Sequence, residues 1–156
     1  MQKHEEFIKE ANKIIQTADH LAYVTYPMIK ETKLLLTITQ NIHNSLLKTM
    51  DSILEYEKLY KYIPEYHNDL STKLEILKTK CVNKYSLPKS FIQIIRETRM
   101  ILDEHEKSSV EFSKHDKLII CSNDFQTRSI NLIQIKSFLL SAKQIIEASS
   151  KIVSKK

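Results

Sequence analysis

The chain has 156 residues, of which 42% are hydrophobic and 28% charged, a composition typical of one soluble globular domain spanning residues 1–156. It contains no glycine, which excludes sites that depend on glycine geometry: the Walker A loop, the dinucleotide-binding fingerprint, the kinase loop and the G-x-S-x-G elbow. The net charge of +5 comes from residues 63–156, which carry 16 basic and 11 acidic side chains. This mild bias permits contact with nucleic acid or with an acidic partner.

Cysteine spacing and hydropathy further limit the classes of protein to which the chain belongs. Cys81 and Cys121 stand 40 residues apart without C-x-x-C spacing, so they are predicted to be free, buried thiols. A metal cluster of Asp19, His20 and His43 is a weak alternative, because adjacent helical residues diverge and nothing fixes the third. No apolar run approaches the roughly 20 residues needed to span a bilayer. We therefore expect a cytoplasmic protein with no cofactor, no metal and no membrane partner.

Apolar residues at helical spacing predict the first two helices. The first covers residues 2–24 and is expected to break or kink at Pro27, since proline lacks the N–H donor and clashes with the preceding turn. The second and longest covers residues 29–62 and ends before Pro64.

Two further helices are predicted over residues 69–84 and 88–106, with Pro88 in the first turn of the latter. The stretch "VEFSKHDK" is expected to be a polar loop with His115 exposed. The following "KLIICSNDFQTRSI" predicts a small β-hairpin in which Asn123 replaces the usual turn glycine. A last helix begins after Asn131, with Gln134 three residues on in capping-box spacing. The predicted fold class is all-α: an antiparallel helical bundle of four to five helices, with a small β-hairpin before the last helix.

The stretch "RETRMILDEHEKSS" places Arg99 and His105 on one predicted helix. At 100° per residue, His105 lies on the apolar, core-facing stripe, whereas Arg99 lies about 120° away and near the stripe's edge. The two would meet only at the rim of a groove. The structural alternative is a histidine at a helix C-terminus, where it interacts with the helix dipole and caps free carbonyls.

An Arg and a His at this spacing on a late helix resemble the HEPN superfamily of small helical proteins. "FIKEANKIIQTADHLAYV", "KLLLTITQNIHNSLLKTMDSIL" and "INLIQIKSFLLSAKQIIEASSKI" resemble its first, second and last helices. The resemblance implies either a non-catalytic binding module or a metal-independent endoribonuclease. In the latter, His105 would act on the RNA 2′-hydroxyl and Arg99 would stabilise the phosphorane, in a dimer. The chain also resembles short, uncharacterised helical proteins of archaea, which implies no activity.

Met100 follows Arg99 where active HEPN members typically carry a polar residue, and this departure favours the non-catalytic interpretation. We therefore predict a binding or interaction module with an RNA or protein partner. The endoribonuclease is the alternative.

The stretch "YEKLYKYIPEY" interleaves aromatic side chains with lysines. Such a pattern suits base stacking with phosphate contact, or a protein interface. The alternative is that the tyrosines close the end of the long helix. Apolar residues here, Tyr56, Leu59, Tyr60 and Ile63, predict a homodimer or a complex. The candidate binding residues are Tyr56, Lys58, Tyr60 and Lys61.

Overall fold

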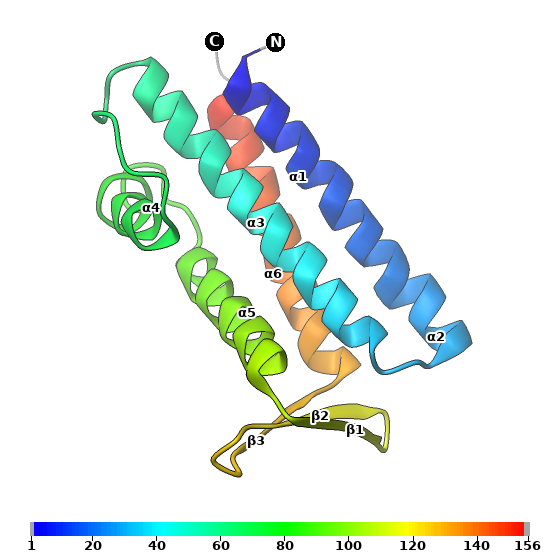
Figure 1. Ribbon diagram of the computed structural model, residues 1–156. Helices are drawn as coiled ribbons and strands as arrows, with labels where there is room; N and C mark the ends of the chain where they lie inside the picture. The colour runs from blue at the N-terminus through cyan, green and yellow to red at the C-terminus, as the bar shows by residue number, and fades with distance from the viewer. Residues whose placement is uncertain (1, 155–156) are drawn as a thin grey trace.

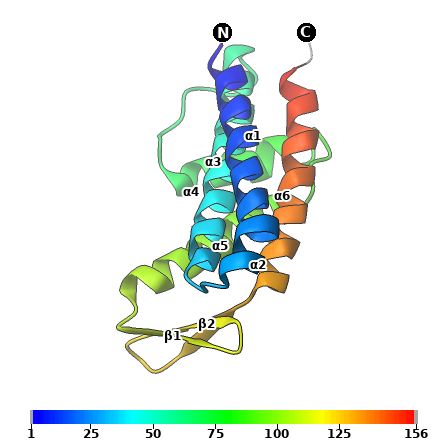
Figure 2. The same ribbon diagram turned by 90° about the vertical axis from the view of Figure 1, so that its right-hand side faces the viewer.

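The computed structural model describes residues 2–154; Met1, Lys155 and Lys156 lie outside the described residues. Within that range the chain is mainly helical, with one small antiparallel sheet (Figure 1). Helices α1 (Lys3–His20) and α5 (Ser90–Lys107) run in one direction, and α3 (Leu34–Leu59) and α6 (Leu132–Val153) run in the other. The start of α1 and the end of α6 lie at one end of the molecule, and the sheet lies at the other (Figure 2).

Helix α3 is central, because it packs against α1, α5 and α6. Its apolar residues recur every three or four positions and are almost completely buried. Burying each such side chain contributes about 1.5–3 kcal/mol, so this stripe holds the neighbouring helices together. The buried stripe consists of Leu35, Ile38, Ile42, Leu46, Met50 and Ile53.

The helix does not break at Pro27, where the sequence predicts a break or kink. Helix α1 continues through a π-helical turn, η1 (Leu21–Thr25), into α2 (Tyr26–Ile29). In this turn the Tyr26 N–H donates to the Leu21 carbonyl, so the hydrogen bonding is wider than in an α-helix and the helix accommodates the proline ring. The helix ends instead at Lys30, which has a left-handed φ of 54°.

A second π-helical turn follows the short α4 (Leu70–Ile76). This turn, η2 (Leu77–Cys81), covers part of the predicted helix 69–84. Asp69 caps α4 by accepting from the Thr72 N–H at 3.0 Å. Cys81 is fully buried, and burial raises the pKa of its thiol to about 12. Cys121 is free but only half-buried, so the prediction of two buried thiols holds for Cys81 alone.

The sheet has three strands in the order β1 (Val110–Lys114), β2 (Lys117–Cys121) and β3 (Thr127–Ile130). The prediction of a polar loop at 110–117 is wrong, because residues 110–114 pair antiparallel with β2. Their side chains are mostly exposed, so no buried face marks the strand in the sequence. His115 is exposed as expected, and it forms the connecting turn with Asp116 at φ 51° and 61°.

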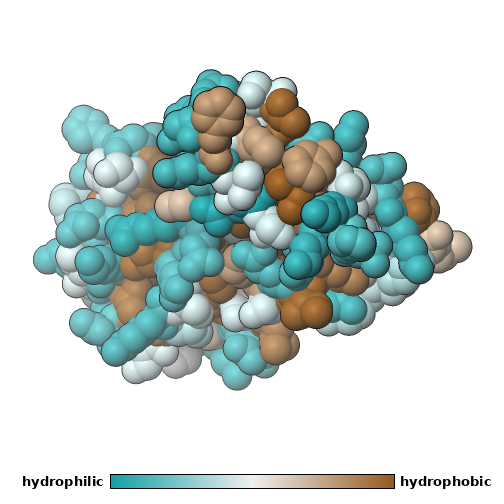
Figure 3. Space-filling view, turned by 90° about the horizontal axis from the view of Figure 1, so that it is seen from below, coloured by the Kyte–Doolittle hydropathy of each residue, from teal (hydrophilic) through white to brown (hydrophobic). Residues whose placement is uncertain are grey.

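The predicted hairpin exists as β2 and β3, but Asn123 does not supply its left-handed turn residue. Phe125 does, at φ 65°, while the Ser122 hydroxyl accepts from the Gln126 N–H at 3.1 Å. One face of the sheet packs on the helices through Leu118, Ile120 and Ile130. Seen from the sheet end, hydrophobic side chains are interspersed among hydrophilic ones (Figure 3).

Helix α6 begins where the sequence predicts. The Asn131 side chain accepts a hydrogen bond from the Gln134 N–H at 2.9 Å, which is the capping contact expected from the spacing. No helix in the described part of the chain combines the length and the apolar character needed to cross a membrane.

Candidate functional site

The two residues singled out on α5 line the same cavity. Arg99 and His105 contribute to a hollow of about 270 Å³ between α3 and α5. The other lining residues are Gln40, His43, Leu102, Asp103 and Glu106. The cavity therefore brings together an arginine, two histidines and two carboxylates.

Each of the two predicted residues is already paired with a carboxylate. The Arg99 Nε lies 3.3 Å from the Asp103 Oδ1, one turn further along α5. The His105 Nδ1 lies 2.7 Å from the Glu111 Oε2 on β1, which ties the end of α5 to the sheet. An incoming phosphate would compete with these carboxylates for the Arg99 guanidinium and the His105 ring.

His105 is not a core residue, although the helical stripe predicts one. Its side chain is 42% exposed, because the end of α5 extends past the core toward the sheet. It does not cap the helix carbonyls either. The Ser108 N–H and hydroxyl both donate to the His105 carbonyl, at 3.3 and 2.9 Å, and so close the helix end.

His43 also lines this cavity, whereas the sequence interpretation considered it only for a weak metal cluster with Asp19 and His20. It is 2% exposed, and its Nδ1 lies 2.8 Å from the Thr98 Oγ1 on α5. The Thr98 hydroxyl donates its one proton to the Ile94 carbonyl at 2.7 Å, so it must accept from the His43 Nδ1–H. The His43 Nε2 therefore carries a lone pair, and it has no hydrogen-bond partner among the described residues.

Burial, together with the smaller effect of the nearby Arg99 charge, lowers the pKa of His43 to about 4, and Asp103 opposes these effects. The imidazole is neutral at pH 7 and only weakly basic. General bases work best when their pKa lies near the operating pH. His43 is therefore suited to a structural bond between α3 and α5 rather than to proton abstraction.

The sequence already indicates that His43 is a buried polar residue. It sits one residue after Ile42 and three before Leu46, on the apolar stripe of the longest predicted helix. A polar residue in that position has to find a partner in the core.

The metal cluster considered for Asp19, His20 and His43 is not supported by the structure, because Asp19 pairs with Lys143. No group of three or more His, Cys, Asp or Glu in the described residues is arranged to hold a metal ion.

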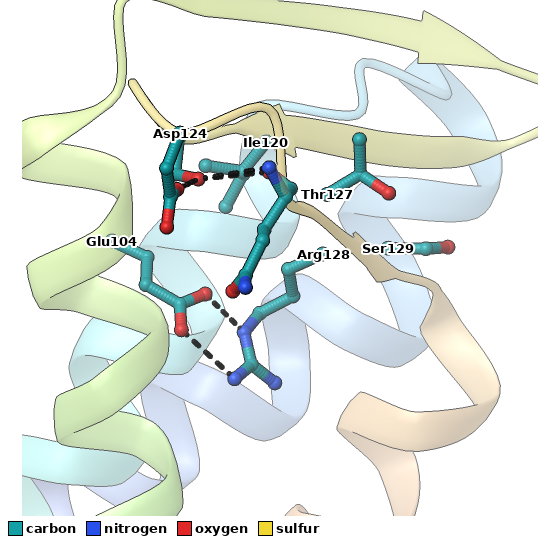
Figure 4. A pocket seen from close by; sticks show the side chains of 8 residues that line it. Glu104, Ile120, Asp124, Thr127, Arg128 and Ser129 are labelled. Carbon is teal, nitrogen blue, oxygen red and sulfur yellow. Dashed lines mark hydrogen bonds and ion pairs between the residues drawn. The ribbon is translucent and has the colours of Figure 1, made fainter.

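The largely polar hollow beneath the sheet is closed by its own ion pair. Arg128 on β3 and Glu104 on α5 face one another, and two guanidinium nitrogens donate to the two carboxylate oxygens (Figure 4). The Arg128 Nη2 lies 3.0 Å from the Glu104 Oε1. The hydrogen bonds with Glu104 raise the pKa of the Arg128 guanidinium. This hollow, of about 560 Å³, is therefore the place where β3 is fastened to α5, and the one guanidinium in its lining is already paired.

The four predicted binding residues at the end of α3 differ in accessibility. Tyr56 is half-buried against His4, with ring centroids 5.4 Å apart. Lys58 is held by Glu55 at 3.2 Å. Only Tyr60 and Lys61 are freely exposed.

The exposed apolar group at this end differs from the predicted one. The left-handed φ of 60° at Lys61 reverses the chain. Ile63 therefore turns into the core, at 6% exposure, and Tyr62 turns outward. We call Leu59, Tyr60, Lys61 and Tyr62 the tyrosine surface.

Comparisons with known proteins add no assignment. No family model, curated protein or solved structure matches the chain.

Proposed function

We propose that this chain is a HEPN-like helical bundle that has no catalytic activity and binds a protein partner, either a second copy or another chain, through the tyrosine surface. The observation that supports this proposal is a contiguous exposed apolar group: Leu59, Tyr60 and Tyr62 are 49%, 48% and 60% exposed. Protein interfaces are enriched in tyrosine, and exposed groups of this kind often mark them.

The tyrosine surface is held in place before any partner arrives. The rings of Tyr60 and Tyr62 stack with centroids 6.2 Å apart and planes at 27°. The Lys84 Nζ lies 3.8 Å from the centre of the Tyr62 ring and 3.0 Å from both carboxylate oxygens of Glu57. A surface fixed in this way loses little conformational entropy on binding, which favours affinity.

Local charge favours protein over RNA at this surface. Lys58 and Lys84 are neutralised by Glu55 and Glu57, so Lys61 supplies the only lysine charge at this end of α3 that has no ion pair within residues 2–154. Affinity for RNA depends on several unneutralised cations that contact phosphates.

A double substitution tests the proposal. Tyr60→Ser with Tyr62→Ser should abolish self-association, measured by light scattering from micromolar to millimolar protein, or should abolish recovery of a defined partner from the native cell. Tyr23→Ser is the matched control, since Tyr23 is 51% exposed on η1, away from the tyrosine surface. A wild-type protein that stays monomeric and recovers no partner would refute the proposal, as would an unchanged assembly in the double variant.

A metal-independent endoribonuclease using Arg99 and His105 is the second candidate. It is favoured by one observation, that both residues line one cavity. The carboxylate partners of both side chains oppose it. The cavity, at about 270 Å³, is also smaller than the roughly 300–1,000 Å³ of typical ligand pockets.

A further inference from the structure

A groove lies between the α4–η2 segment and α5, and it shares no lining residue with the tyrosine surface or with the Arg99 cavity. Figure 1 shows α4 nearly end-on beside the start of α5. The hollow has a volume of about 510 Å³, within the roughly 300–1,000 Å³ typical of binding sites. One of its walls includes the π-helical turn η2, and such turns are frequent at functional sites.

The groove has apolar side chains among its lining residues. Val82 follows η2, and Ile92 and Met100 come from α5. Met100 is 51% exposed and Ile92 is 8% exposed. The same Met100 that departs from the HEPN pattern therefore contributes apolar surface here.

Three cations surround these apolar side chains. Lys78 projects from η2, Lys89 precedes the first turn of α5 and Arg96 lies two turns further on. All three are exposed, and none forms an ion pair with any residue in the range 2–154. The lining contains one carboxylate, Glu97, so the groove has an excess of positive charge.

We infer that this groove binds an acidic amphipathic helix of another protein. Apolar side chains on one face of that helix would contact Val82, Ile92 and Met100. Its flanking carboxylates would pair with Lys78, Lys89 and Arg96. A groove between two helices with apolar walls is the usual receptor for an amphipathic helix, and complementary charge sets the choice of partner.

The lining residues favour this partner over RNA. None of them is aromatic, so the groove has no surface on which bases could stack. The adjoining hollow beside α4 shares Arg96 and adds Leu70, Leu74 and Ile76, together with the carboxylate of Glu75. Apolar surface of this extent suits aliphatic side chains rather than a sugar–phosphate chain.

A selection from a displayed library of random helical peptides tests the inference on the full chain. Enriched sequences should carry apolar residues at i, i+3, i+4 and i+7 with Asp or Glu beside them. A fluorescein-labelled enriched peptide should bind in an anisotropy titration and weaken as salt rises. Arg96→Glu and Lys78→Glu should each weaken binding at least tenfold, and Met100→Asp should do the same.

Lys13→Glu is the matched control, because Lys13 is an exposed cation on α1; it should leave binding unchanged. Circular dichroism of each variant should show the wild-type helix content. The inference is overturned if no sequence is enriched, if enriched peptides are neutral or basic, or if Arg96→Glu and Lys78→Glu bind as the wild type does. Tighter binding of a labelled oligouridine through the same cations would also overturn it. Because neither Tyr60 nor Tyr62 lines the groove, the double tyrosine variant should still bind the peptide.

Discussion

Acidification should destabilise the protein through His43. The folded state holds the pKa of this imidazole near 4, whereas an unfolded histidine has a pKa near 6.5. Between these values the unfolded chain binds a proton that the folded chain does not, so stability rises with pH across this window and is lost as pH falls. At about 1.36 kcal/mol per pKa unit, the full loss approaches about 3 kcal/mol.

The same relation gives the loss of unfolding free energy at a pH that is convenient for the measurement. At pH 5 the wild type should have lost about 2 kcal/mol of unfolding free energy relative to pH 7. Urea denaturation at pH 7, 6 and 5 measures this quantity directly. His43→Asn keeps an amide donor for Thr98 but cannot be protonated in this range, so its stability should change much less over the same interval.

His115→Asn is the control, because His115 is exposed in the β1–β2 turn, where asparagine tolerates the left-handed φ. It should retain the full pH dependence of the wild type. If wild type and His43→Asn lost stability in parallel between pH 7 and pH 5, the assignment of a buried neutral imidazole would be refuted.

Three further stability predictions concern buried polar groups. Lys84→Met should cost about 3 kcal/mol in urea denaturation, because it leaves the 1%-exposed carboxylate of Glu57 without its cation; an unchanged unfolding midpoint would contradict the pairing. Ser149 is fully buried, and its hydroxyl has no hydrogen-bond partner among the described residues, so Ser149→Ala should stabilise the protein by about 0.5–1 kcal/mol. Ser52→Ala should instead destabilise it by about 1 kcal/mol, since the Ser52 hydroxyl donates to the His4 carbonyl at 2.5 Å. Equal changes in melting temperature for the two serine variants would contradict the stated difference in hydrogen bonding of their hydroxyl groups.

The helices were predictable because their apolar periodicity is unbroken. The stripe from Leu35 to Ile53 on α3 is the core in the structure, and the Asn131 cap begins α6 as its spacing indicates. The continuation of the helix through Pro27 was not predictable, because a local widening of the helix leaves no pattern of side chains. Strand β1 was missed for a related reason. Backbone hydrogen bonds hold it, whereas most of its side chains face solvent.

The candidate site was predictable only in part. The sequence shows Arg99 and His105 at a defined spacing on one predicted helix. It does not predict their two carboxylate partners equally well. Asp103 follows Arg99 at helical spacing, whereas Glu111 reaches His105 across the connection between α5 and β1, whose geometry the spacing does not fix. His43 comes from α3, a separate helix, so its meeting with Thr98 depends on packing.

The most direct test of the central claim, that the chain binds without catalysis, is an incubation of purified protein with end-labelled RNA in EDTA, analysed for 2′,3′-cyclic phosphate ends. The proposal predicts no such ends above those formed with protein omitted. Cleavage by the wild type that disappears in folded Arg99→Ala and His105→Ala, and persists in His115→Ala, would contradict it and establish the endoribonuclease instead.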